Sequence, residues 1–177
     1  MNEKAKSLGM ENTCFKNTTG LDDDGHFSSA LDVAIMTKEL LKHKIIFDYT
    51  CIWMDTIRNG AFGLSNTNRL VRFYDGANGM KTGFTDKAMY CLSGTALRNG
   101  MQLIAVVLGA PSSNERFSAT KSLLDYGFAN YTVITPEKMY IENLTVDGGE
   151  KNTITADYTP EPILVKKEDK EKISSLF

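Results

Sequence analysis

The sequence predicts a mixed α/β (α+β) protein in which helices cover an antiparallel sheet and a small all-β region follows. Two strongly β-prone runs, residues 88–97 and 101–109, stand next to each other and indicate a central hairpin. Apolar residues recur at helical spacing over residues 29–43 and again after Pro111. From residue 136 onward the pattern changes to short alternating strands. Helices combined with neighbouring antiparallel strands are typical of this class.

The N-terminal part contains two predicted helices separated by a loop. Residues 2–8 predict the end of a helix that Gly9 closes, because glycine readily adopts the left-handed conformation found after helix ends. Residues 12–28 are rich in Thr, Gly and Asp and predict a long surface loop. Ser29, with Asp32 three residues later, resembles an N-terminal cap, so a helix is predicted to begin there and to end near residue 43.

Two hairpins are predicted in the middle of the chain. Between residues 45 and 71 the β-branched and aromatic content rises, and Arg58-Asn59-Gly60 favours a type I′ turn between two strands. The second hairpin turns at Arg98-Asn99-Gly100. Residues 103–108 in its second strand are apolar without interruption, so we expect this strand to be buried on both faces.

The C-terminal part predicts one long helix and then a change of architecture. Ser112 and Ser113 are suited to cap a helix that begins after Pro111. The predicted core-facing stripe of this helix consists of Phe117, Leu123, Leu124 and Phe128. After Tyr131, alternating apolar residues and a Gly148-Gly149 turn predict short antiparallel strands. We therefore predict two domains, which comprise residues 1–135 and 136–177.

Composition indicates a globular chain and excludes several functions. The 177 residues are 42% hydrophobic and 24% charged, close to the average for soluble globular domains. The net charge is −2 and no basic cluster is interleaved with aromatic residues, so no nucleic-acid partner is predicted. Residues 103–110, the longest apolar stretch, are far fewer than the roughly 20 that a membrane-spanning helix needs. Residues 1–6 lack the apolar core of a signal peptide, so any export signal is expected upstream or not at all.

No metal or other cofactor is predicted. The cysteines lack the close spacing of metal ligands and are interpreted as mostly buried small hydrophobic residues. They are Cys14, Cys51 and Cys91. Asp22-Asp23-Asp24 lacks the alternating ligands and the twelfth-position Glu of a calcium loop, which favours a solvated turn. His26 and His43 have no partner pattern for catalysis, and we expect both at the surface.

One tripeptide, Lys81-Thr82-Gly83, has the chemistry to bind a peptide that ends in a carboxylate. The Lys81 ammonium supplies a positive charge, and the Thr82 hydroxyl is able to donate a charge-assisted hydrogen bond to the same carboxylate. Gly83 has no Cβ, so a ligand backbone has room to lie alongside as an added strand. The backbone amide of Phe84 would then point at the scissile carbonyl as half of an oxyanion hole.

Three longer stretches around this tripeptide carry a resemblance. They are MNEKAKSLGMENTCFKNTTGLDDDGHFSSALDVA, SNTNRLVRFYDGANGMKTGFTDKA and GMQLIAVVLGAPSSNERFSATKSLLDYGF. Over residues 2–128 the chain resembles the low-molecular-weight D-alanyl-D-alanine carboxypeptidases, which are penicillin-binding proteins of bacterial wall metabolism. Lys81-Thr82-Gly83 matches the third element of their signature, after S-x-x-K and S-x-N. The resemblance implies a transpeptidase-like, β-lactamase-like fold with the tripeptide on the sheet edge that borders the active site.

The resemblance also implies an activity. Such enzymes are serine hydrolases that trim the terminal D-alanine from peptidoglycan pentapeptides through an acyl-enzyme. The partners would be a peptide ending in D-Ala-D-Ala and, for the complete enzyme, β-lactam antibiotics. The complete family member would be extracytoplasmic and membrane-associated. Arg116 matches a family arginine near the substrate end of the site, whereas Met89 stands where relatives usually have Gly and is expected to crowd the turn after the tripeptide.

No catalytic residue is predicted within this chain. In the family, the S-x-x-K and S-x-N elements precede the helix with which this sequence begins, so the resemblance implies that the nucleophilic serine lies upstream. Ser118-Ala119-Thr120-Lys121 and Ser112-Ser113-Asn114 imitate these elements. They follow Lys81-Thr82-Gly83 instead of preceding it and crowd within about ten residues, so we interpret them as chance matches.

Two functions stay open at this point. The chain is either part of a D-Ala-D-Ala carboxypeptidase, inactive in isolation, or a non-catalytic module of that family that binds peptides or acts structurally. A related endopeptidase or β-lactamase activity is also compatible, because the deciding residues would lie upstream. In the first case the predicted substrate-binding residues are Lys81, Thr82, Gly83, Phe84 and Arg116.

Overall fold

The computed structural model describes residues 1–137, 139–158 and 160–174. Its described part forms two compact units. The first contains Met1–Arg98 and Gln102–Gly127, and the second contains Asn99–Met101 together with the chain from Phe128 onward. The domain boundary expected between residues 135 and 136 stays a prediction.

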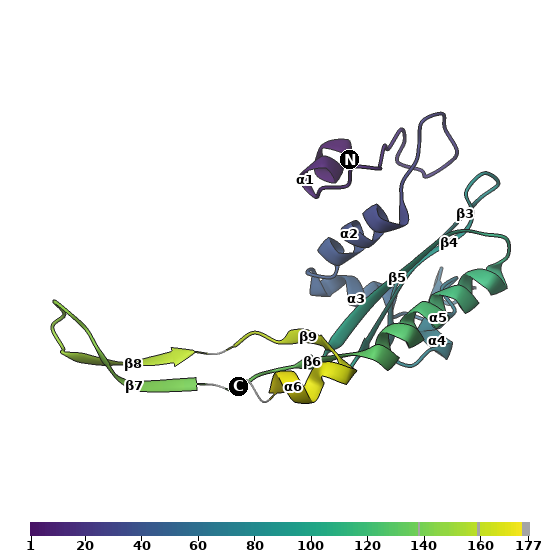
Figure 1. The fold of residues 1–177 in the computed structure, drawn as a ribbon. Coiled ribbons are helices and arrows are strands. Elements are labelled where there is room, and N and C mark those ends of the chain that lie inside the picture. Colours follow the sequence, from purple (N-terminus) through teal and green to yellow (C-terminus); the bar gives the residue numbers. More distant parts are fainter. Residues whose placement is uncertain (138, 159, 175–177) are drawn as a thin grey trace. The chain divides into compact units, whose positions relative to one another are not determined.

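The chain before residue 131 mixes short helices with antiparallel strands (Figure 1). The helices are α1 (Asn2–Ser7), α2 (Ala30–Leu40), the 3-10 helix η1 (Lys44–Ile46), α3 (Phe47–Thr50), α4 (Leu70–Phe73) and α5 (Ser113–Asn130). The strands are β1 (Met54–Ile57), β2 (Phe62–Ser65), β3 (Ala77–Thr85), β4 (Met89–Arg98) and β5 (Met101–Ala110). The mixture of helices with an antiparallel sheet confirms the predicted fold class.

The central sheet has the strand order β3-β4-β5, and helices lie on both of its faces (Figure 1). The hydroxyl of Ser93 on β4 hydrogen-bonds the hydroxyl of Thr37 on α2 at 2.8 Å. The next residue, Gly94, faces the other side, where a Cβ would lie only 2.6 Å from a methyl carbon of Thr120 on α5. Because successive strand residues point to opposite faces, α2 and α5 cover opposite faces of the sheet.

The core under α5 corrects one prediction about that helix. Phe117 and Leu124 are buried as expected, but Leu123 is 50% exposed. Leu124 lies about two full turns after Phe117 and therefore on the same face, whereas Leu123 is displaced by about 100° around the helix. The fully buried Thr120 takes the position in the core-facing stripe that was expected for Leu123. A hydroxyl is tolerated there because it donates a hydrogen bond to the backbone oxygen of Arg116, 2.8 Å away.

The predicted tight turns are confirmed. Asn59 and Gly60 have φ angles of 56° and 86°, and positive values at both central positions are what a type I′ turn between β1 and β2 requires. Asn99 and Gly100 have φ angles of 49° and 77° between β4 and β5. These two hairpins are therefore set by local sequence.

Predicted helix ends are confirmed as well. Gly9 adopts a φ of 79° after α1. The side chain of Ser29 caps α2 by accepting a hydrogen bond from the backbone N–H of Asp32 at 3.1 Å. Ser112 accepts one from the backbone N–H of Glu115 at the start of α5, at 3.2 Å. Helix α2 ends at Leu40, three residues earlier than expected.

Two burial predictions are wrong. Strand β5 is not buried on both faces: Met101 and Ala105 are buried, but Leu108 is 40% exposed. The cause is its place in the sheet, since no strand among the described residues flanks the outer edge of β5. None of the three cysteines is buried either, because each lies in a loop or near an element end, where solvent has access.

The second unit consists mainly of paired strands, as predicted for the C-terminal part. Strand β6 (Tyr131–Ile134) pairs with β9 (Ile163–Lys166), and β7 (Met139–Thr145) pairs with β8 (Thr153–Tyr158), both antiparallel. The chain then continues into η2 (Lys167–Asp169) and α6 (Lys170–Ser174). None of the described helices combines the length and apolar character that a membrane crossing requires.

Candidate binding site on strand β3

The tripeptide Lys81-Thr82-Gly83 lies on β3, an outer strand of the central sheet. Its other edge has no strand partner among the described residues. Burial alternates along the strand, with Lys81 and Gly83 exposed and Thr82 buried. All three line a cavity of about 740 Å³. The structure thus brings the tripeptide to an accessible sheet edge beside an open cavity, which is the arrangement that an added peptide strand needs.

Hydroxyl, amide and ammonium groups form hydrogen bonds at the tripeptide and at Gly79, which precedes it on β3. The hydroxyls of Thr82 and Thr67 lie 2.6 Å apart. The side-chain amide of Asn68, fully buried, donates to the backbone oxygen of Gly79 at 2.9 Å. The Lys81 ammonium donates to the backbone oxygen of Thr82 at 2.7 Å, so its charge stays at the strand edge. Thr67 and Asn68 immediately precede α4, which packs against β3 and positions both side chains.

Arg116 clamps the two strands beside Gly83. It is only 6% exposed, although helix position alone would suggest a surface side chain. One guanidinium nitrogen donates to the backbone oxygens of Gly83 at 3.3 Å and of its cross-strand partner Cys91 at 3.2 Å. The other terminal nitrogen donates to the hydroxyl of Ser113 at 3.2 Å. Arg116 therefore reaches from α5 to the tripeptide and also lines the same cavity.

The charge of Arg116 has no carboxylate partner among the described residues. Its partners are neutral oxygens and the rings of Tyr90 and Phe117, whose centroids lie 5.5 and 4.7 Å from the guanidinium carbon. Its Nε is buried without a hydrogen-bond partner among the described residues. Burial is the main cause that lowers the pKa of Arg116. A buried cation compensated in this way favours an anion nearby.

Gly83 is not required by the interior of the fold. A Cβ built on Gly83 would meet only the Cβ of Cys91, at an ordinary distance of 3.7 Å. Its φ is not in the left-handed range that favours glycine. The next residue, Phe84, is 55% exposed and packs its ring against Tyr90 with centroids 4.5 Å apart. The absence of a side chain at Gly83 therefore matters to whatever occupies the cavity and not to packing.

The long loop before α2 is tied to the turn after the tripeptide. Asp22 accepts hydrogen bonds from the hydroxyl of Thr85 at 2.7 Å and from the backbone N–H of Lys87 at 3.4 Å. This corrects the expectation of a purely solvated Asp run. The tether brings Thr19 and Gly20 to the cavity wall.

Met89 stands in the same turn and adopts a φ of 58°. Such a value is uncommon for a residue with a side chain and natural for glycine. The strain lies at the first residue of β4, opposite Thr85 on β3. The expectation that Met89 crowds the turn after the tripeptide stays a prediction.

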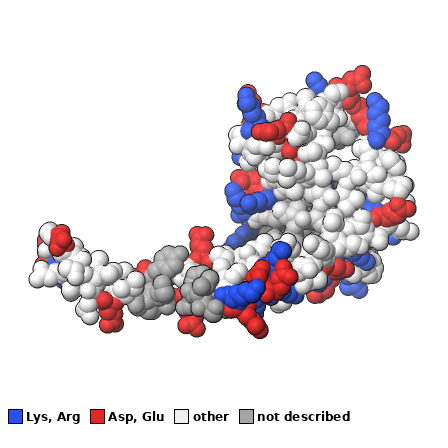
Figure 2. Space-filling model, viewed as in Figure 1, with Lys and Arg blue, Asp and Glu red and all other residues white. Residues whose placement is uncertain are grey.

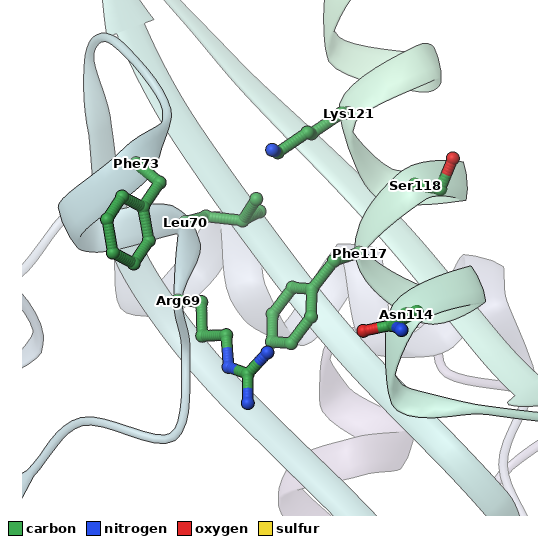
Figure 3. A pocket seen from close by; sticks show the side chains of 7 residues that line it. All are labelled: Arg69, Leu70, Phe73, Asn114, Phe117, Ser118 and Lys121. Carbon is green, nitrogen blue, oxygen red and sulfur yellow. The ribbon is translucent and has the colours of Figure 1, made fainter.

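The serine and lysine that imitate a catalytic pair lie elsewhere. Ser118 and Lys121 line a different cavity, between α4 and α5, that shares no lining residue with the cavity at Lys81. Figure 3 shows the Ser118 hydroxyl pointing away from Lys121 and from the other labelled side chains. The two side chains are therefore not arranged as nucleophile and base.

The histidines differ from each other. His43 is exposed as predicted. His26 is only partly exposed, with its ring edge-on to Phe15 at a centroid distance of 5.9 Å. Its Nδ1 is buried without a hydrogen-bond partner among the described residues.

Three residues of the site were not predicted from the sequence. Thr67 and Asn68 belong to the stretch SNTNRL, which carried the family resemblance but no assigned role, and Asp22 belongs to the acidic run. Their partners on β3 and its turn are 11 to 65 residues away in sequence. No local pattern marks such contacts.

Charges on the visible surface are mixed. Figure 2 shows lysine and arginine side chains interspersed with aspartate and glutamate on this face, without a single large basic field.

The sequence profile of the D-alanyl-D-alanine carboxypeptidase family, peptidase S11, matches residues 1–112. The chain is 47% identical to D-alanyl-D-alanine carboxypeptidase DacF of Bacillus subtilis over 149 residues, which are 82% of this chain and 38% of that protein. It is 38% identical to DacC of Escherichia coli over 139 residues, which are 78% of this chain and 34% of that protein. The chain spans little more than a third of the length of these two relatives.

Solved structures agree. Penicillin-Binding Protein D2 from Listeria monocytogenes, in its cefotaxime-bound form, aligns with a TM-score of 0.66 and 39% identity over 72% of this chain and 53% of that one. The Streptomyces K15 DD-transpeptidase aligns with a TM-score of 0.68 and 30% identity over 72% of this chain and 52% of that one. The fold is therefore the transpeptidase, β-lactamase-like fold, as predicted. With the profile match over more than half of its length, the chain belongs to the peptidase S11 family of D-alanyl-D-alanine carboxypeptidases.

Proposed function

We propose that this chain carries the substrate-binding half of the active site of a serine D-Ala-D-Ala carboxypeptidase, and that the nucleophile comes from a segment outside these 177 residues. The observation that carries the proposal is the position of Lys81-Thr82-Gly83 on an outer strand whose free edge lines a cavity. The substrate would be a peptidoglycan pentapeptide ending in D-Ala-D-Ala. The whole protein would work outside the cytoplasm, where such peptides occur.

The terminal carboxylate of the substrate is bound by Lys81 and Thr82 in this proposal. The two hydroxyls at 2.6 Å form a relay in which Thr67 donates to Thr82 and leaves the Thr82 proton free for the carboxylate. The Lys81 ammonium, now bonded to the Thr82 carbonyl, needs only a side-chain rotation to approach the same anion. Both bonds would be charge-assisted and therefore among the stronger hydrogen bonds in proteins.

The substrate backbone lies along β3. Because nothing pairs with the outer edge of β3 among the described residues, a peptide is able to add as a further strand. Gly83 permits close approach of the two backbones, and the Phe84 amide would point at the scissile carbonyl. One backbone N–H from this chain would then supply half of the oxyanion hole, and the segment with the nucleophile would supply the other half.

Arg116 acts as a positioning residue. It ties Gly83 and Cys91 together through their carbonyls, which fixes the strand edge where the carboxylate binds. Its buried charge, with no carboxylate partner among the described residues, adds positive potential to the cavity. An incoming anion would relieve part of the cost of burying this cation.

The chemical step would belong to the missing segment. A serine hydroxyl would attack the D-Ala-D-Ala carbonyl, the terminal D-alanine would leave, and water would then release the acyl group. β-Lactams would be captured by the same serine in the whole protein, in agreement with the family structures in cefotaxime-bound and ampicillin-bound forms. In this chain Ser118 is unsuited to the role because its hydroxyl points away from Lys121.

A fluorescent penicillin tests the missing nucleophile. We expect the isolated chain to show no covalent label after denaturing electrophoresis, because no serine among the described residues stands beside a base at the cavity. A label that survives denaturation would overturn this part of the proposal. The same experiment with the chain joined to the segment encoded upstream is expected to give a label.

Binding of diacetyl-Lys-D-Ala-D-Ala, followed by NMR titration of the isolated chain, tests the substrate site. We expect Lys81→Ala to weaken binding by about 10- to 100-fold, the value of one charge-assisted hydrogen bond. The matched control is Lys87→Ala, which removes an exposed lysine from the turn after β3. An equal loss of peptide affinity in both variants would show that only the net charge of the chain matters and would contradict a specific role of Lys81. If the extended protein, before any reaction with penicillin, also fails to bind the peptide, the site itself is refuted.

A further inference from the structure

A second cavity, of about 370 Å³, lies between α4 and α5 (Figure 3). This volume is within the range of small-molecule sites in proteins. Its lining residues come from two segments, residues 69–73 and residues 114–121. None of them belongs to the cavity at Lys81-Thr82-Gly83, so the two cavities are separate.

Two cations line this cavity without a partner. The side chains of Arg69 and Lys121 form no hydrogen bond or ion pair within the part of the chain that the structure describes. No acidic side chain lines the cavity, and the amide of Asn114 adds a neutral donor. In Figure 3 the Lys121 ammonium extends over the cavity from α5, opposite α4. Besides burial, the positive charge of Arg69 contributes to lowering the pKa of the nearby Arg116.

The floor of the cavity is apolar. Leu70 is fully buried and Phe117 is 7% exposed, and both form part of the lining. Phe73 lines it from α4 although its ring is 66% exposed. That ring is held edge-on against Trp53 with centroids 5.7 Å apart. An exposed but fixed aromatic ring provides contact area for a ligand at little cost in conformational entropy.

We propose that this cavity binds a small organic anion that joins a carboxylate or phosphate group to an aromatic or short aliphatic body. The anionic group lies between Arg69 and Lys121, with Asn114 as a further donor, and the apolar body lies against the exposed ring of Phe73 and the accessible edge of Phe117. An inorganic anion would leave the exposed Phe73 ring in contact with water, and a neutral apolar ligand would leave the two cations unpaired. Only an amphipathic anion satisfies both halves of the cavity.

Phenyl phosphate is a suitable probe for the wild-type chain, with binding measured by isothermal titration calorimetry. We expect saturable binding at least about tenfold tighter than that of inorganic phosphate or benzyl alcohol, each of which supplies one half of the required chemistry. Replacing both cations, as Arg69→Gln with Lys121→Gln, is expected to weaken binding at least about tenfold, corresponding to roughly 1.4 kcal/mol.

The matched control is Arg72→Gln, which removes an exposed cation from the same helix α4 without touching the cavity lining. We expect its affinity to stay within about twofold of wild type, and circular dichroism to show that all variants fold. A second, independent variant is Phe73→Ala, which should weaken phenyl phosphate binding but not the binding of inorganic phosphate.

Cosedimentation with phosphatidylglycerol vesicles distinguishes the source of the anion. Sedimentation that requires both Arg69 and Lys121 assigns the cavity to a lipid headgroup, and its absence together with phenyl phosphate binding assigns a soluble ligand. The proposal is overturned if phenyl phosphate does not bind, or if Arg72→Gln reduces its affinity as much as the double variant does.

Discussion

Replacing Gly83 by alanine separates what the fold needs at this position from what a ligand needs. In the folded chain the added methyl would meet only the Cβ of Cys91, at 3.7 Å, and the backbone is not in the left-handed range. Alanine loses less backbone entropy on folding than glycine, so we expect the free energy of unfolding to rise by about 0.5 to 1 kcal/mol. For a chain of this size that corresponds to roughly 1 to 4 °C in Tm.

Ligand binding should change in the opposite direction. The same methyl would project from the face of the sheet into the cavity that Gly83 lines and crowd the peptide there, so we expect the affinity for diacetyl-Lys-D-Ala-D-Ala to fall at least about tenfold. Urea denaturation measures the stability, and NMR titration measures the affinity.

The control is Gly63→Ala on β2, where a Cβ would meet nothing within 4 Å. It should gain similar stability and leave the peptide affinity unchanged. The reasoning is refuted if Gly83→Ala destabilises the chain by more than about 2 kcal/mol, or if it binds the peptide as tightly as wild type does.

Three further predictions concern stability. Asp32 is 1% exposed, and its side chain accepts two short hydrogen bonds from the preceding loop. Asp32→Ala should therefore lower the free energy of unfolding, measured by urea denaturation, by about 2 to 4 kcal/mol. A loss below about 1 kcal/mol would contradict this expectation. Gly94→Ala would place a Cβ 2.6 Å from Thr120, so the same measurement should show a loss of about 1 to 3 kcal/mol, and an unchanged midpoint would show that the helix yields freely. Burial and the hydrogen bond to Asp125 raise the pKa of Tyr74 to about 12. Because this folded-state pKa lies above the usual 10, the contribution of the hydroxyl is complete below about pH 10 and is lost as the pH rises toward 12. Absorbance titration should therefore show one late-titrating tyrosine that is absent from Tyr74→Phe.

Features that depend on neighbouring residues were predictable from the sequence. The Asn-Gly pairs at residues 59–60 and 99–100 require positive φ angles and specify turns wherever they stand between β-prone runs. Ser29 and Ser112 cap their helices with bonds to residues three positions later. These signals are short-range, and tertiary packing did not override them.

Burial of single residues was predictable only in part, because it depends on which side of an element meets the rest of the fold. Leu123 has the same composition signal as Leu124 but lies about 100° away on α5. Arg116 belongs to an unremarkable polar helix start, and only the approach of the β3-β4 hairpin buries it. The number of apolar residues in such a helix does not show which of its faces is buried.

In the candidate site, too, the local feature could be predicted and the long-range contacts could not. The tripeptide was visible because its residue types suit a carboxylate ligand, and the family resemblance gave it a context. The hydrogen bond between Thr67 and Thr82 joins residues 15 positions apart, and that between Asp22 and Thr85 joins residues 63 positions apart. Neither partner alone has an unusual sequence environment, so only the fold reveals the pair.

The central sheet has a consequence for how the chain reaches this fold. Its strands follow each other in space in the order in which they occur in sequence, with short turns between β3, β4 and β5. Pairings of this kind have low contact order, so little chain entropy is lost in closing the turns before the strand contacts form. We therefore expect the strand that carries Lys81 to acquire hydrogen-exchange protection together with β4 early in refolding, before contacts with the distant N-terminal loop are complete.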